Sequence, residues 1–122
     1  MCKILISINP EHVINIFNGS KKYEYRKIRC KENVDKLIIY CTNPVKKIVG
    51  EANVEAILVD SPQKIWEQTK NESGINLEFF NEYYKGKNKA IAYKLDNIKK
   101  YDKPLDLSYM GVKNAPQSFI YV

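Results

Sequence analysis

The chain has 122 residues, of which 20 are Lys or Arg and 14 are Asp or Glu, so its net charge is +6. This length favours a single domain over residues 1–122, with a core that needs no disulfides. No apolar run approaches the roughly 20 residues of a membrane span, and the three cysteines show no CxxC spacing. These features exclude a membrane protein and a disulfide scaffold, and they predict a cytoplasmic protein without a structural zinc.

The chain opens with a predicted strand and a short helix. Apolar residues dominate 3–8, which is typical of a buried strand. Asn9 is a suitable cap, Pro10 suits the first helical turn, and Gly19 ends the helix. His12, the only histidine, has no potential metal ligand at a useful spacing. We expect it to be a surface or capping residue.

Residues 22–29 alternate in the manner of a second strand. Tyr23 and Tyr25 lie on one predicted face, which we assign to the core. The opposite face carries Lys22, Glu24 and Arg26, with Lys21 in the turn before them. Taken alone, this face is either a binding surface or an exposed sheet surface with ion pairs that contribute at most about 1 kcal/mol each.

The remaining elements do not alternate regularly between strand and helix, which argues against a doubly wound parallel sheet. Gly50 lies near the start of one long strand and predicts a bend of the kind that barrels need. Residues 99–103 are polar and are predicted to form a turn or a strand end. Strands are predicted at 35–41, 46–59, 89–96 and 119–122, and helices at 61–73 and 76–86. The resulting fold class is α+β, a small and mainly antiparallel β-barrel flanked by about three helices.

Positive charge is concentrated in one segment. Between Lys21 and Lys31 there are six cations and a single anion, Glu24, so this segment supplies +5 of the net charge. Such local basicity predicts a site for an anionic partner. Three aromatic residues in the predicted helices are candidates for stacking on a base: Trp66, Tyr83 and Tyr84.

The usual catalytic signatures are absent. The sequence contains no GxGxxG, GxxxxGK[ST], HExxH or GxSxG pattern. With one histidine and no paired cysteines, we expect neither a bound metal nor a cofactor. Any catalysis would depend on Lys21 and Glu24, an amine and a carboxylate suited to proton transfer.

The segment Gly19-x-Lys21-x-x-Glu24-x-Arg26 resembles the GxKxxExR signature of ASCH domains, which belong to the PUA-like superfamily. The resemblance extends to residues 7–10, to Ile39–Thr42 and to residues 116–119. It implies a β-barrel with a cleft between barrel and helices, lined by the motif residues, and a role in binding RNA or modified bases. The residues that it implies at the ligand are Lys21, Lys22, Glu24, Arg26, Ser7, Gln117 and Ser118.

One bacterial branch of the family is an amidohydrolase that acts on acetylated cytidine. In that branch the position matching Glu24 is a threonine nucleophile beside the motif lysine. Here Lys21 is retained but the hydroxyl is absent. The acyl-enzyme mechanism therefore does not transfer, although a carboxylate at this position is able to orient a water molecule.

Three hypotheses follow. The leading one is a small module that binds RNA or a nucleotide in a basic cleft. The second is an amidohydrolase for an acylated nucleoside that uses Lys21 and Glu24. The third is a domain whose basic strip contacts an acidic protein. The first hypothesis predicts RNA binding that weakens as salt increases, and the second predicts turnover of acylated nucleosides. The third predicts protein binding that survives nuclease treatment.

Overall fold

A computed structural model describes residues 2–31 and 33–122 of the chain. Six strands form one sheet in the order β2-β5-β4-β3-β1-β6. The strands are β1 (Lys3–Ile8), β2 (Tyr23–Arg26), β3 (Lys36–Cys41), β4 (Lys47–Asp60), β5 (Ala90–Leu105) and β6 (Phe119–Tyr121). The helices are α1 (Pro10–Phe17), α2 (Pro62–Thr69) and α3 (Leu77–Tyr83), with short 3₁₀ turns η1 (Lys70–Glu72) and η2 (Leu107–Met110).

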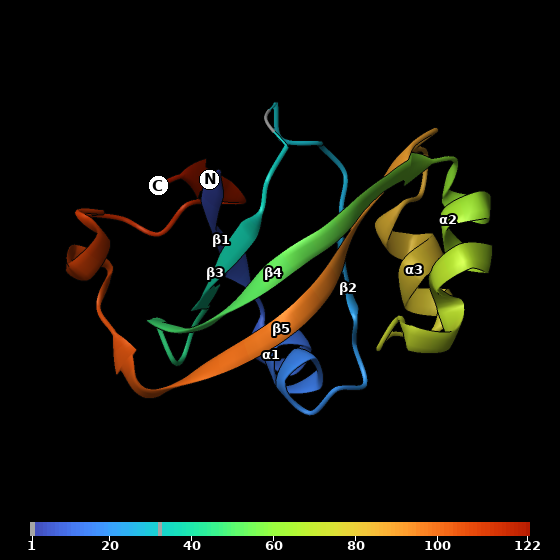
Figure 1. Cartoon of the computed structure of the whole chain (residues 1–122). Helices are drawn as coiled ribbons and strands as arrows, with labels where there is room; N and C mark the ends of the chain where they lie inside the picture. The colour runs from blue at the N-terminus through green and yellow to red at the C-terminus, as the bar shows by residue number, and fades with distance from the viewer. Residues whose placement is uncertain (1, 32) are drawn as a thin grey trace.

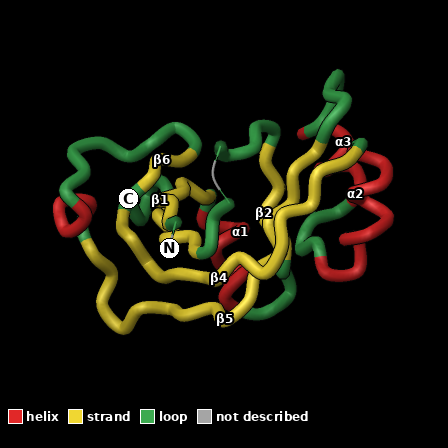
Figure 2. The backbone as a smooth tube through the Cα atoms, turned by 45° about the horizontal axis from the view of Figure 1, so that its top comes forward, coloured by secondary structure: helices red, strands yellow, loops and turns green. Residues whose placement is uncertain are grey.

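The sheet is mainly antiparallel and strongly curved. Only β1 and β3 run parallel, and the other neighbours pair antiparallel. Figure 1 shows β4 and β5 as a long twisted ribbon, with α2 and α3 beyond one end and α1 beneath the strands. The strands curl into a half-barrel that leaves α1 within the curve (Figure 2). The α+β fold with three flanking helices is therefore confirmed, and the barrel is open rather than closed.

Gly50 lies at the bend of β4, as predicted. The pairing of β4 with both of its neighbours shifts register next to this residue. A Cβ atom at Gly50 would collide with the carbonyl oxygen of Lys99 and would lie 2.7 Å from the Phe17 ring. The missing side chain thus lets β5 and the end of α1 approach β4 from two directions.

Within the described residues, the core consists of three buried clusters, the smallest of which contains Leu5, Ile38, Tyr40 and Ile48 and is not part of the site described below. The first lies between α1 and the strands and contains Val13 and Ile16 of the helix. The second lies between β2, β5 and the helices α2 and α3. It includes Tyr25, Phe80 and Ala92, and the small side chain of the alanine allows α2 to pack closely on β5.

Two strands differ in length from the prediction. β2 ends at Arg26, whereas the alternation predicted a strand to residue 29. Arg26 pairs with Ile91, and β5 begins at Ala90, so the chain beyond Arg26 has no strand to pair with. Conversely, the polar residues 99–103 lie within β5, because Lys99 and Lys100 pair with β4.

Other local features agree with the sequence predictions only in part. Ser61 and Asn76 cap α2 and α3 through their side chains, whereas Asn9 begins α1 without a side-chain cap. Cys30 and Cys41 are buried, as expected for small apolar side chains. Within residues 2–31 and 33–122, no helix is both long and apolar enough to cross a bilayer.

Candidate functional site

β2 separates tyrosines from charges across its two faces. Tyr23 and Tyr25 enter the second core cluster, whereas Glu24 points to the opposite side. That opposite side is not an open sheet surface, since Glu24 is only 5% exposed. The structure therefore excludes the reading of Glu24 and Arg26 as solvent-exposed surface ion pairs.

Glu24 faces a pocket of about 260 Å³ between α1, the end of β1, β2 and α3. Aromatic rings form one part of its wall, from Tyr25, Phe79 and Tyr83. Five residues expected at the ligand from the sequence also line it: Ser7, Lys21, Glu24, Arg26 and Gln117. The pocket thus combines a carboxylate, two cations and flat apolar rings in one concavity.

Lys21 is almost fully buried at the base of this pocket, with 2% of its surface exposed. Its Nζ donates a hydrogen bond to the Ser73 carbonyl at 3.1 Å and lies 4.6 Å from the centre of the Tyr25 ring. Burial lowers the pKa of Lys21, because desolvation penalises the ammonium form, while the negative charge of Glu24 acts in the opposite direction. Gly74 packs directly on the Lys21 stem, where no side chain would fit.

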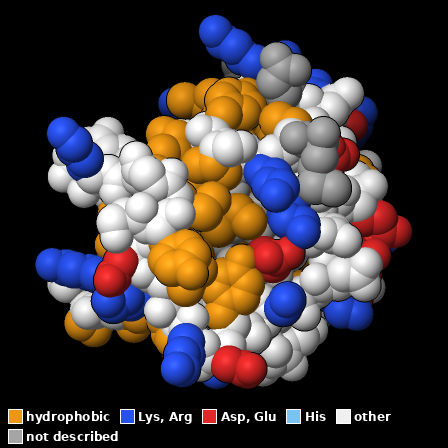
Figure 3. All heavy atoms as spheres, turned by 60° about the vertical axis from the view of Figure 1, so that its left-hand side comes forward, with side chains coloured by type: hydrophobic (Ala, Val, Ile, Leu, Met, Phe, Trp, Pro, Cys, Tyr) orange, Lys and Arg blue, Asp and Glu red, His pale blue; other side chains and the backbone are white. Residues whose placement is uncertain are grey.

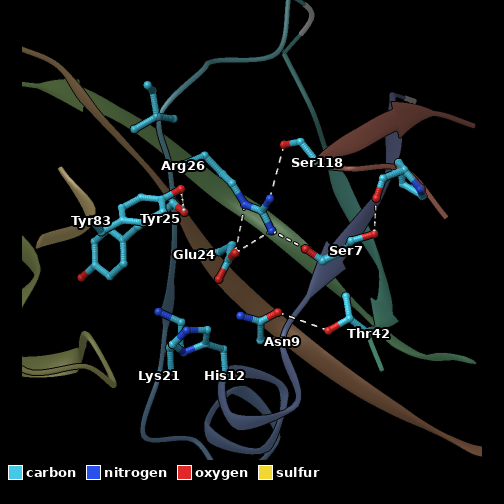
Figure 4. Close-up of polar contacts among 12 residues, drawn as sticks. Ser7, Asn9, His12, Lys21, Glu24, Tyr25, Arg26, Thr42, Tyr83 and Ser118 are labelled. Atoms are coloured by element: carbon cyan, nitrogen blue, oxygen red, sulfur yellow. Dashed lines mark hydrogen bonds and ion pairs between the residues drawn. The ribbon is translucent and has the colours of Figure 1, made fainter. Parts of the chain in front are cut away.

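Arg26 fixes the carboxylate of Glu24. Its Nε donates to Glu24 Oε2 at 3.0 Å, and its Nη2 forms an ion pair with the same oxygen at 2.9 Å and donates to the Ser7 carbonyl at 2.6 Å. The remaining Nη1 donates to Ser118 Oγ at 3.3 Å. Figure 4 shows the guanidinium group held between these partners, with the other Glu24 oxygen turned towards the part of the pocket where Lys21 and Asn9 end.

Residues 116–118, which are near the end of the sequence, pack beside the pocket. Ser7 donates through its amide to the Ser118 carbonyl at 3.0 Å and through Oγ to the Pro116 carbonyl at 2.7 Å. This pairing brings Gln117 to the pocket wall. Ser118 is absent from the wall itself and instead contacts the guanidinium of Arg26.

The other cations of the basic segment lie outside the pocket. Lys22 is exposed and pairs with Glu72 at 3.1 Å. Lys27, Arg29 and Lys31 are exposed beyond the end of β2, and the ammonium of Lys27 lies 4.6 Å from the centre of the Tyr83 ring. The face that carries the chain termini is not uniformly basic, since hydrophobic, basic and acidic side chains are interspersed on it (Figure 3).

His12 lies in the pocket wall, contrary to its expected place on the surface. Its ring meets Phe79 edge to face at a centroid distance of 5.3 Å. Its Nδ1 is buried and has no hydrogen-bond partner within the described residues. Burial, followed by the charge of Lys21, lowers the pKa of His12. Val13 of α1 lies in the core, so His12, one position earlier on the helix, lies beside the buried face and borders the pocket. This position next to Val13 is the sequence signal that could have placed His12 at the site.

Of the three aromatic residues considered for base stacking, only Tyr83 lines the pocket. Tyr84 is buried, and its hydroxyl lies 2.8 Å from the Arg26 carbonyl oxygen. Trp66 packs against the second core cluster. Among the residues that the structure describes, no group of three or more His, Cys, Asp or Glu side chains is arranged to hold a metal ion.

The family model described as a domain of unknown function, DUF365, matches residues 4–113. The chain belongs to the DUF365 family. Its fold is similar to the crystal structure of ASCH from Zymomonas mobilis, with a TM-score of 0.89 and 26% identity over 98% of this chain and 87% of that one. The resemblance of this DUF365 chain to ASCH domains, and hence to the PUA-like fold, is confirmed.

The relatives that match in sequence include three different proteins. An "ASCH domain-containing ribonuclease" of Zymomonas mobilis is 32% identical over 92 residues, which are 75% of this DUF365 chain and 62% of the relative. A "large ribosomal subunit protein uL22" and an "ATP synthase subunit alpha" of Ureaplasma parvum are each 31% identical over 98% of this chain. The chain spans only 39% and 15% of these two relatives.

A more distant likeness concerns the fold alone. The N-terminal domain of McrB from Staphylothermus marinus has a TM-score of 0.53 and 13% identity, over 88% of this chain and 78% of that domain.

Proposed function

We propose that this ASCH domain binds single-stranded RNA and receives the base of one nucleotide in the pocket. The observation that carries the proposal is the convergence of Lys21 and Glu24 with the rings of Phe79 and Tyr83 on one concave surface. Unpaired RNA bases are recognised by stacking on aromatic rings and by hydrogen bonds to their edges. Glu24 accepts a hydrogen bond from the base edge, and Lys21 donates to an oxygen or ring nitrogen.

The size of the pocket favours a single base or nucleoside. Sites for drug-sized ligands usually measure about 300–1,000 Å³. The pocket here, at about 260 Å³, lies just below that range. We therefore place one base or nucleoside in the pocket and the flanking nucleotides of an RNA strand outside it.

The exposed cations beyond β2 supply contacts for those flanking phosphates. Lys27, Arg29 and Lys31 follow Arg26 directly in the chain and are exposed. Lys27 lies over the Tyr83 ring, so positive charge borders the aromatic wall of the pocket. Phosphate contacts of this kind release counterions, which makes binding decrease as salt concentration increases.

The relatives support RNA as the ligand class to different degrees. The ribonuclease of Zymomonas mobilis is named for an activity on RNA. The ribosomal protein and the ATP synthase subunit carry matching segments within much longer chains, and their names share no activity. Those two matches are consistent with a module that occurs in different proteins, and they assign no ligand to it.

The residues take distinct roles in the proposed complex. Lys21 and Glu24 contact the base, with Gln117 beside them. Arg26 acts as a positioning residue, because its donors are already engaged by Glu24, Ser7 and Ser118. Lys22 has no part in the pocket.

The test is the binding of a labelled single-stranded 12-mer RNA, the DNA of the same sequence and the RNA duplex, each at two salt concentrations. We expect the single-stranded RNA to bind most tightly, and more weakly at higher salt. Lys21→Met keeps the buried volume and removes the charge, and it should weaken binding at least tenfold. Lys64→Met removes the same charge from the exposed surface of α2 and should weaken binding less than threefold. Equal loss in both variants, or no binding of the single strand, contradicts the proposal.

Hydrolysis in the same pocket is a second candidate function. It is favoured by the lowered pKa of Lys21, since an amine that loses its proton more readily serves as a proton acceptor. The substrates to examine are the RNA strand itself and acylated nucleosides. Turnover by the wild type that is lost in Glu24→Gln supports this function. Equal rates in the two proteins contradict it.

A further inference from the structure

Asn9 occupies the N-cap position directly before α1 but does not use its side chain to cap the helix. Its carbonyl oxygen accepts the hydrogen bonds of the His12 and Val13 amides, both at 3.0 Å. The side chain makes no capping hydrogen bond, although asparagine is among the best capping residues. Its amide group instead lies at the rim of the pocket (Figure 4).

Thr42 contacts the Asn9 amide group through its oxygen atom. Thr42 follows β3, and its Oγ1 donates a hydrogen bond to Asn9 Oδ1 at 3.2 Å. Its backbone amide also donates to the Ile8 carbonyl at 3.0 Å, which anchors the hydroxyl beside α1. With Oδ1 occupied by Thr42, the donor Nδ2 is turned towards the pocket (Figure 4).

Glu24 presents the complementary group from β2. The hydrogen bond and the ion pair with Arg26 both involve Oε2, so Oε1 is the oxygen turned to the same part of the pocket as Asn9. A carboxylate accepts hydrogen bonds only, and an amide nitrogen donates only. The pocket thus offers an acceptor held by Arg26 and a donor held by Thr42.

We propose that Asn9 is a specificity-determining residue, oriented by Thr42, that donates a hydrogen bond to the acceptor atom of a planar ring whose donor group binds Glu24. The edge of a nucleobase carries acceptor and donor groups side by side and has this chemistry. This inference rests on the proposed function, because it concerns the ligand of the same pocket. It adds that discrimination among bases depends on the rim residue Asn9 and on Thr42, which itself touches no ligand.

The test measures binding of the four ribonucleoside 5′-monophosphates to the wild type and to matched variants. Asn9→Ala removes the donor, Asn9→Asp replaces it with an acceptor at equal volume, and Thr42→Val removes the hydroxyl at equal shape. For the preferred nucleotide we expect each of Asn9→Ala and Thr42→Val to weaken binding about tenfold. Thr42→Ser keeps the hydroxyl and should stay within twofold of the wild type. Asn9→Asp should change the order of preference among the four nucleotides.

The outcomes separate this inference from the proposed function. Binding that is lost in Lys21→Met but unchanged in Asn9→Ala and Thr42→Val overturns the role of Asn9 and leaves the pocket as the binding site. Failure of the wild type to bind any nucleotide overturns both. Melting temperatures within about 2 °C of the wild type for the Asn9 variants are expected, since the side chain makes no helix cap.

Discussion

Arg26 donates a hydrogen bond from Nε to Oε2 of Glu24 at 3.0 Å, and its Nη2 forms an ion pair with the same oxygen at 2.9 Å. Both side chains are largely removed from solvent, with 13% and 7% of their surfaces exposed. The two residues are separated by one position on the short strand β2. The guanidinium group also donates hydrogen bonds to the Ser7 carbonyl and to Ser118 Oγ. It therefore fixes the carboxylate and links β2 to the opposite edge of the sheet.

Loss of this guanidinium group should destabilise the folded protein. In Arg26→Met the carboxylate of Glu24 remains buried without its partner, and we expect the free energy of unfolding to decrease by about 3–5 kcal/mol. Lys22→Met is the matched control, because its ion pair with Glu72 is half-exposed and should contribute at most about 1 kcal/mol. Urea denaturation of both variants measures the difference. Equal losses in the two variants contradict a special role for the Arg26–Glu24 pair.

His12 reports on the charges in the pocket. Burial and Lys21 lower its pKa from 6.5, while Glu24 raises it. We expect its NMR titration midpoint to lie below 6.5, to increase in Lys21→Met and to decrease further in Glu24→Gln. Because the imidazole binds its proton less readily in the folded state, its effect on stability appears as pH falls below 6.5 and lowers the free energy of unfolding there. A midpoint that is unaffected by both substitutions contradicts the proximity of the three groups.

Gly74 is needed for the position of Lys21. It has a φ of +68°, and a Cβ atom there would overlap the Lys21 side chain and lie 2.8 Å from the Lys21 Cα. Gly86 has a similar φ of +77° but no atom within 4 Å of such a Cβ. We expect Gly86→Ala to cost about 1–2 kcal/mol from backbone strain alone. Gly74→Ala should cost roughly 1–3 kcal/mol more and should weaken ligand binding. Thermal denaturation of the two variants checks this, and equal costs contradict it.

Much of the fold follows from local sequence patterns. The alternation around Tyr23 and Tyr25 predicts which face of β2 enters the core, and Gly50 predicts the bend of β4. The lengths of β2 and β5 do not follow from pattern, because strand ends are set by the presence of a partner. Lys99 and Lys100 are polar, yet they extend β5 because β4 lies alongside them.

The candidate site was predictable only in part. Lys21, Glu24 and Arg26 are close in sequence, so the basic segment and its single acid draw attention to them. Alternation places Lys22 beside them, but its side chain reaches Glu72 instead. His12 and Asn9 enter the pocket through the way α1 packs against the sheet, and the local sequence offers only the position of His12 next to the core residue Val13 as a signal.

The most direct test of the central claim is an NMR titration of the uniformly ¹⁵N-labelled protein with a single-stranded hexaribonucleotide of mixed sequence. The account predicts that the largest amide shifts fall on α1, on residues 21–26 and on α3 around Phe79 and Tyr83, and that Lys21→Met abolishes them. Shifts confined to the face that carries the termini, or the same shifts in Lys21→Met, would contradict the assignment of this pocket as the RNA-binding site.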